Sequence, residues 1–167
     1  SLRSHFLGYY NRRYDTNYQF NDIWTDDPCE FFNITKKQVL KEYLEFMKYT
    51  HGFMDISLVE GAVEAVRKLK ENYHSLELIS SMPNFLQGNT KKYIKENFGD
   101  AFYDFHFMDT FSFLRGFFGN YTRQEWKLTK LGCLEADVLG EDSIDIAKEA
   151  SKKGMKVFLF NYPWNTR

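Results

Sequence analysis

The stretch ADVLGEDSIDIAKEASKKGMKVFLFNYPWN, residues 136–165, decides the fold. It begins with an apolar run that predicts a β-strand over residues 136–140. Ser143 then opens a predicted helix over residues 143–153, which two lysines and a glycine close, as cations and glycine close many helices. A second apolar run predicts another strand over residues 156–161. A strand, a helix and a strand in this order are typical of a parallel β-α-β unit.

Two adjacent acids, Glu141 and Asp142, follow the first of these strands. Open α/β folds bind their ligands at the carboxyl ends of parallel strands. Carboxylate oxygens are also the ligands that Mg²⁺ prefers in proteins. The pair therefore predicts a magnesium site. The alternative interpretation is a solvated acidic turn at the start of a helix, where negative charge is favourable in any case.

The rest of the chain alternates between helical and strand patterns, which favours a parallel α/β fold with right-handed crossovers. Thr35 and Gln38 have the spacing of a capping box and mark the start of one helix. The fingerprints of dinucleotide-binding and P-loop nucleotide-binding sites are absent from the sequence. The remaining predicted elements are helices over residues 3–14, 35–49, 59–71, 88–97 and 124–135, and strands over residues 76–80 and 103–108.

The quoted stretch resembles the fourth motif of the haloacid dehalogenase-like hydrolase superfamily, in which an apolar strand ends in two acids that hold Mg²⁺. The closing YPWN, residues 162–165, resembles the end of the 5′-nucleotidase-like (deoxyribonucleotidase-like) branch. The opening FLGYYNRRYDTNY, residues 6–18, resembles the stretch after that branch's nucleophile motif. The resemblance covers almost the whole chain and implies a Rossmann-like three-layer core with a parallel sheet and a small helical cap. It divides the chain into residues 1–14 (start of the core or cap), 15–56 (helical cap) and 57–167 (core).

The resemblance also implies positions for residues that bind phosphate. Ser80 matches the hydroxyl residue that ends the family's second motif, and Ser81 follows it in the strand LELISS. From the residues alone, a turn serine ahead of Pro83 is the favoured interpretation. A hydroxyl at the end of a strand is suited to hydrogen-bond a phosphate oxygen. We therefore expect Ser80 to be catalytic and both serines to bind phosphate.

A lysine completes the expected site. Lys127 precedes Glu141 by fourteen residues and matches the family's motif lysine, which holds the phosphate and the nucleophile by charge. Lys130, one turn further along the same predicted helix, is the competing match, and a solvated surface lysine is the alternative for either. We expect Lys127 to be catalytic and to bind phosphate, while Glu141 and Asp142 bind Mg²⁺.

The family's first motif, Asp-x-Asp-Gly, does not occur in residues 1–167. The family forms its phosphoryl-enzyme on the first Asp of that motif, so we expect this Asp upstream of Ser1. Glu141 and Gly140 also depart from the Asp and the bulky apolar residue that the family more often has. Two hypotheses follow from the sequence. The first is a Mg²⁺-dependent, nucleotidase-like phosphohydrolase that acts on a phosphorylated small molecule such as a nucleotide. The second is a degenerate homologue that serves as a structural or binding subunit and holds Mg²⁺ weakly or not at all.

Composition limits the expected partners. The net charge of −1 provides no broad attraction to nucleic acid or to an anionic membrane. No apolar run approaches the roughly 20 residues that span a bilayer. Cys29 and Cys133 follow no pattern, which favours thiols in an intracellular, reducing compartment over a disulfide. Aromatic residues crowd residues 102–118, so this segment is either core or a patch that binds a protein partner.

Overall fold

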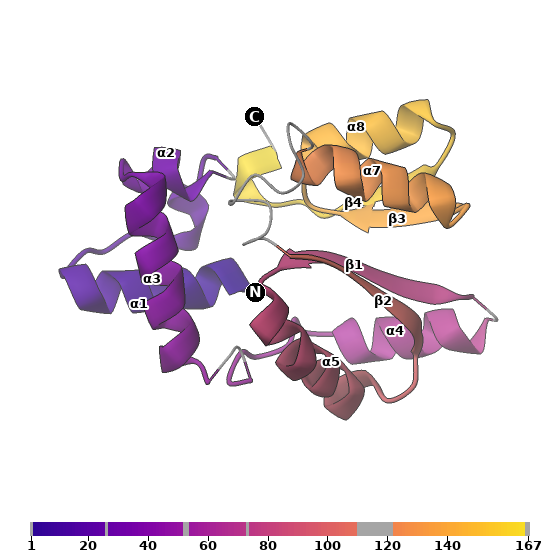
Figure 1. The fold of residues 1–167 in the computed structure, drawn as a ribbon, viewed down its shortest axis with the longest axis horizontal. Coiled ribbons are helices and arrows are strands. Elements are labelled where there is room, and N and C mark those ends of the chain that lie inside the picture. The colour runs from indigo at the N-terminus through magenta and orange to yellow at the C-terminus, as the bar shows by residue number, and fades with distance from the viewer. Residues whose placement is uncertain (1, 26, 52–53, 73, 110–121, 166–167) are drawn as a thin grey trace. The chain divides into compact units, whose positions relative to one another are not determined.

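The computed structural model describes residues 2–25, 27–51, 54–72, 74–109 and 122–165. This part of the chain holds seven α-helices and two two-stranded parallel sheets (Figure 1). The α/β class is therefore confirmed, whereas the single Rossmann-like sheet stays a proposal because the described strands form two separate pairs. The chain divides into two compact units, which are described in turn. The first comprises Ser1 and Thr50–Lys127, and the second comprises Leu2–Tyr49 and Leu128–Arg167.

The first unit is built on one pair of parallel strands and two helices. Its elements are α4 (Ala62–Glu71), β1 (Leu76–Met82), α5 (Asn84–Phe98) and β2 (Phe102–Asp109). Figure 1 shows α4 and α5 on the same side of the strand pair. The Lys91 ammonium lies 5.8 Å from the ring centre of Phe105 and 5.7 Å from that of Phe107. These rings alternate along β2, so α5 covers the sheet face that carries them.

The neighbouring residues of β1 and β2 form a polar pair. Glu77 Oε2 lies 2.5 Å from His106 Nε2, and the Asp104 carboxylate lies 4.0 Å from the same nitrogen. The alternation along residues 103–108 predicted a half-buried strand, and the strand is confirmed. No role was predicted for His106, and the structure pairs it with Glu77 on the adjacent strand.

The second unit begins with a bundle of short helices that uses much of the chain's aromatic content. Its elements are α1 (Leu2–Tyr14), the 3₁₀ turn η1 (Phe20–Asp22), α2 (Pro28–Phe32) and α3 (Lys36–Tyr49). Phe6 stacks on Tyr43 with ring centres 4.6 Å apart and meets the fully buried Phe46 edge to face. The capping box predicted at the start of α3 is confirmed, since Thr35 N–H donates to Gln38 Oε1 and Gln38 N–H donates to Thr35 Oγ1.

A buried carboxylate joins α1 to α3. Glu42 is only 3% exposed, and its Oε2 lies 3.1 Å from Arg13 Nε. The Tyr14 hydroxyl donates to Glu42 Oε1 at 2.6 Å, and this hydrogen bond raises the pKa of Tyr14. Burial raises the pKa of both Tyr9 and Tyr10 on the same helix. The Glu42 charge is therefore compensated by several donors, as a buried charge requires.

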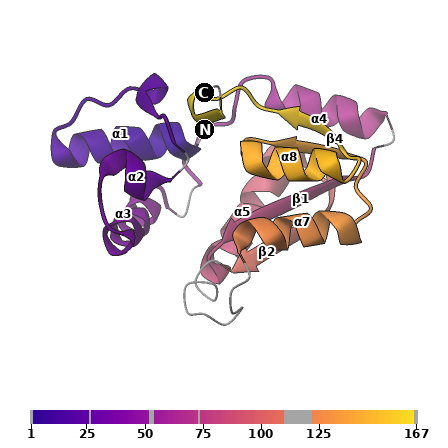
Figure 2. The same ribbon diagram turned by 90° about the horizontal axis from the view of Figure 1, so that it is seen from above.

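The second unit continues with the β-α-β run predicted for residues 136–165. The helix α7 spans Arg123–Cys133, and its part from Leu128 onward belongs to this unit. The elements that follow are β3 (Val138–Glu141), α8 (Ile144–Lys152), β4 (Lys156–Leu159) and the 3₁₀ turn η2 (Pro163–Asn165). β3 and β4 pair in parallel, from Val138 opposite Lys156 to Glu141 opposite Leu159. α8 lies beside this pair (Figure 2), and its buried side chains are Ile146, Ala147 and Ala150. The predicted parallel β-α-β unit is confirmed.

Several predicted boundaries were wrong. β1 continues to Met82, so Ser80 and Ser81 lie within the strand and not at its end. α5 begins at Asn84 and not at residue 88, since Pro83 suits the position before a helix and Asp109 Oδ1 accepts the Asn84 N–H. The tail of the aromatic segment, residues 110–118, lies outside the described residues. In the part of the chain that the structure describes, no helix combines the length and apolar character needed to cross a membrane.

Candidate active site

The two acids lie where β3 ends and α8 is about to begin. Glu141 is the last residue of β3, and Asp142 and Ser143 form the turn before Ile144 starts the helix. We call Glu141–Ser143 the acidic turn. The structure thus confirms that the acids stand at the carboxyl end of a parallel strand. This is the position from which open α/β folds present residues to a ligand.

The Glu141 carboxylate is bound by the backbone of its own turn. Glu141 is 6% exposed, and its Oε1 accepts the N–H of Asp142 at 2.9 Å and of Ser143 at 3.1 Å. These N–H groups precede α8, where the helix itself supplies no acceptor. Glu141 therefore caps the start of α8, as in the alternative interpretation of the acidic pair, but it is buried and not solvated as that interpretation expected. Its role as a metal ligand stays a prediction.

The C-terminal YPWN segment, Tyr162–Asn165, binds the main chain of the acidic turn. The carbonyl oxygen of Asp142 accepts the Trp164 indole N–H at 3.1 Å and an Asn165 side-chain N–H at 3.0 Å. Asn165 Nδ2 also donates to the carbonyl of Phe160 at 2.6 Å, and Asn165 Oδ1 accepts the Tyr162 N–H at 3.1 Å. Both ends of the Asn165 amide are thus used. The sequence identified this segment only by resemblance and predicted no contact for it.

Side chains from the start of the chain hold the YPWN segment. The Trp164 ring stacks on Tyr162 with centres 4.5 Å apart and planes 19° apart. The Arg3 guanidinium lies 4.0 Å from the centre of the Trp164 ring, within the range of a cation–π contact. Phe20 meets Trp164 edge to face at 5.9 Å. No sequence pattern predicted the contacts of Arg3 and Phe20 with Trp164, since they join residues more than 140 positions apart.

The described residues fit part of a Mg²⁺ site. The chemistry of the donors is suitable, because carboxylate oxygens are hard ligands and Asp142 is half-buried at the strand end. In the described ranges, however, no group of three or more His, Cys, Asp or Glu side chains is arranged to hold a metal ion. Mg²⁺ demands near-octahedral oxygen ligands and is bound weakly when the protein supplies few of them. We therefore derive no reaction step through the metal.

The predicted phosphate-binding residues lie in the first unit. Ser80 pairs with Phe107 and Ser81 with Met108 in the β1–β2 register, and both serines are half-buried. Lys127 is half-buried on α7. Glu141 and Asp142 belong to the second unit. The assembly of these residues into one site is therefore part of the proposal made below.

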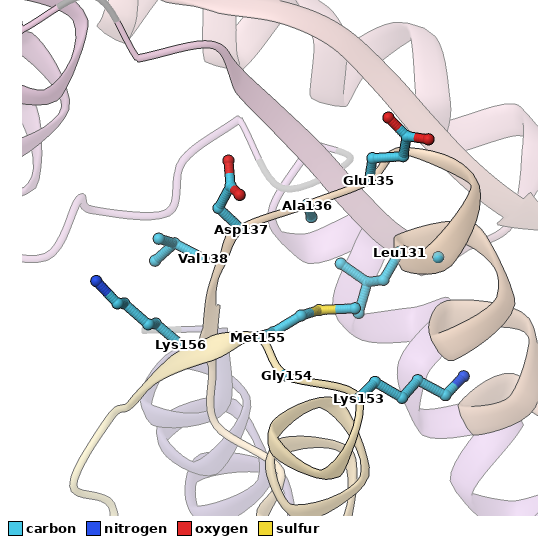
Figure 3. A pocket seen from close by; sticks show the side chains of 10 residues that line it. Leu131, Glu135, Ala136, Asp137, Val138, Lys153, Gly154, Met155 and Lys156 are labelled. Carbon is cyan, nitrogen blue, oxygen red and sulfur yellow. The ribbon is translucent and has the colours of Figure 1, made fainter.

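A hollow of about 520 Å³ lies at the opposite end of the β3–β4 pair (Figure 3). Asp137, Val138 and Lys156, at the amino ends of the two strands, line it together with Met155. Figure 3 shows the Met155 side chain extending toward Leu131 across the hollow. Since α/β folds bind ligands at the carboxyl ends of strands, we do not assign this hollow to the candidate site.

Comparison with known proteins gives no match to any family model, curated protein or solved structure. The proposal below therefore stands on the geometry of the acidic turn and on the resemblance of the quoted motifs.

Proposed function

We propose that this chain forms part of a Mg²⁺-dependent phosphohydrolase of the haloacid dehalogenase-like superfamily, close to its 5′-nucleotidase-like branch. The substrate is a phosphorylated small molecule such as a nucleotide. The reaction passes through an aspartyl-phosphate on an Asp that lies outside residues 1–167. The observation that carries the proposal is the acidic turn at the carboxyl end of a parallel strand, followed at once by a helix.

The proposed site needs β1 and β3 in one parallel sheet, so that Ser80 and Asp142 share its carboxyl edge. Parallel strands are normally found in larger sheets that are covered on both faces. In the structure each parallel sheet has two strands, and Phe158 on β4 is 69% exposed. A larger sheet with a second covering layer accounts for both features. This is the three-layer Rossmann-like core that the resemblance implies.

In this arrangement each residue has a simple chemical role. The hydroxyl of Ser80 donates a hydrogen bond to a phosphate oxygen. Ser81 lies on the opposite face of β1 and is given no role at the same phosphate. The Lys127 ammonium offsets negative charge on the phosphoryl group as it is transferred. Asp142 would hold Mg²⁺, and a bound Mg²⁺ supplies further charge stabilisation at the phosphoryl oxygens. Glu141 fixes the main chain of the turn through its two N–H contacts.

The test is phosphate release from a panel of nucleoside monophosphates by the protein expressed from its complete gene. We expect Mg²⁺-dependent turnover that falls at least 100-fold in Asp142→Asn, as loss of a residue at the reacting centre commonly does. Asp137→Asn is the matched control, because Asp137 is an exposed acid at the other end of the same segment. Turnover that Asp142→Asn leaves unchanged would overturn the proposal, as would equal losses in both variants.

A second function also accounts for the exposed aromatic side chains at β4. Phe158 on β4 is 69% exposed, although aromatic side chains on a parallel strand are usually covered, and Phe160, just after β4, is 56% exposed. A degenerate homologue that serves as a binding subunit would cover them with a partner protein. Complete absence of phosphatase activity, together with association that Phe158→Ser abolishes in analytical ultracentrifugation, would favour this function over the enzyme.

A further inference from the structure

The peptide group between Asp142 and Ser143 is hydrogen-bonded on both sides. Its N–H donates to Glu141 Oε1 at 3.1 Å. Its carbonyl oxygen accepts from both Trp164 and Asn165, at 3.1 and 3.0 Å. A carbonyl oxygen has two lone pairs, so these two donors saturate it. Rotation of this peptide plane would break three hydrogen bonds at once.

We propose that Trp164 and Asn165 are positioning residues that fix this peptide and thereby orient the Asp142 carboxylate toward the position where it would hold Mg²⁺. This inference rests on the proposed function. The carboxylate leaves the main chain at the Cα atom next to the fixed carbonyl, so the peptide plane limits its direction. Groups that orient a ligand through a hydrogen bond commonly change metal affinity or activity by 10- to 100-fold when they are removed.

The structure also shows what holds the two donors in place. The Asn165 side chain donates to the Phe160 carbonyl and accepts the Tyr162 N–H, and these two hydrogen bonds orient its amide. Trp164 lies between the Tyr162 ring and the Arg3 guanidinium, at 4.5 and 4.0 Å. These contacts hold an aromatic ring at position 164 independently of its N–H.

Two variants remove the donors. Trp164→Phe keeps an aromatic ring but removes the indole N–H. Asn165→Asp keeps the size and the acceptor oxygen but removes the side-chain donor. Trp24→Phe is the matched control, because Trp24 is exposed and lies in the same unit.

The first measurement is amide hydrogen exchange by NMR on the chain 1–167. We expect exchange at the Ser143 amide to accelerate at least tenfold in Trp164→Phe and Asn165→Asp, while the amide of Met47 within α3 keeps its rate. Unchanged exchange at Ser143 would overturn the proposal. Equal acceleration at Ser143 and Met47 would also overturn it, because the two residues would then act on general stability.

The second measurement separates this proposal from the proposed function. Mn²⁺, a paramagnetic substitute for Mg²⁺, should broaden the Ser143 amide signal, and Asn165→Asp should need at least tenfold more Mn²⁺ for the same broadening. If wild type shows no broadening there, the proposed function fails, whereas accelerated exchange would still establish that the YPWN segment holds the turn. Broadening with equal Mn²⁺ dependence in wild type and Asn165→Asp would refute the positioning role alone.

Discussion

Removal of the Glu141 side chain should destabilise the second unit by about 2 kcal/mol. The carboxylate is 6% exposed and accepts two backbone N–H groups ahead of α8. Loss of an acceptor at a helix start costs about 0.5–2 kcal/mol, and each N–H left without a partner adds on the order of 1 kcal/mol where water does not replace it. Asp142 and Ser143 are half-buried, so water replaces part of what Glu141→Ala removes.

The matched variant Glu141→Gln separates hydrogen bonding from charge. Glutamine keeps an oxygen at the Oε1 position and loses only the negative charge near the helix start, which is worth about 0.5 kcal/mol. In thermal unfolding, Glu141→Ala should lower Tm by roughly 4–8 °C and Glu141→Gln by roughly 1–2 °C. A cost below about 0.5 kcal/mol for Glu141→Ala would show that the carboxylate does not cap α8. Equal losses in the two variants would show that charge, and not the hydrogen bonds, accounts for the effect.

Three further predictions concern the helices, alkaline pH and activity. Glu42→Ala should lower the free energy of unfolding by about 2 kcal/mol in urea titration, because it leaves Tyr14 without its acceptor and removes the buried carboxylate that pairs with the exposed Arg13; a loss below about 0.5 kcal/mol would contradict this. Stability should fall as pH rises above about 10, where the unfolded chain releases tyrosine protons that the folded chain retains. Burial raises the pKa of Tyr10, so Tyr10→Phe should flatten this dependence, and an unchanged slope would refute the cause. The chain 1–167 alone should release no phosphate from nucleoside monophosphates, since it lacks the Asp-x-Asp motif, and turnover that Asp142→Asn abolishes would contradict that expectation.

Local patterns predicted the secondary structure well because their causes are local. The capping box of Thr35 and Gln38 sets the start of α3 within four residues of sequence. The apolar runs and the acids of residues 136–165 likewise predicted β3, α8, β4 and the position of the acidic turn. The predicted start of α5 was wrong by four residues. Asp109, which accepts the Asn84 N–H at the true start, lies on β2, 25 residues away in the sequence.

Contacts between distant segments could not be predicted in the same way. Glu42 lies in an amphipathic helix, where a charged residue is usually solvated, and its partners Arg13 and Tyr14 lie on another helix. Asn165 carries no local pattern that points to Asp142. Both depend on which elements pack together, and hydrophobic periodicity gives the buried face of an element but not its neighbour.

The most direct test concerns the claim that the carboxyl ends of β1 and β3 meet at one edge of a sheet, which places Ser80 near Asp142. A nitroxide label on Asp145→Cys, with both natural cysteines replaced by serine, would mark the start of α8 next to the acidic turn. Paramagnetic broadening of the β1 amides by NMR then reports which end of β1 lies nearer. The account predicts strong broadening at Ser81 and weak broadening at Leu76. Equal broadening along β1, or the reverse gradient, would contradict it.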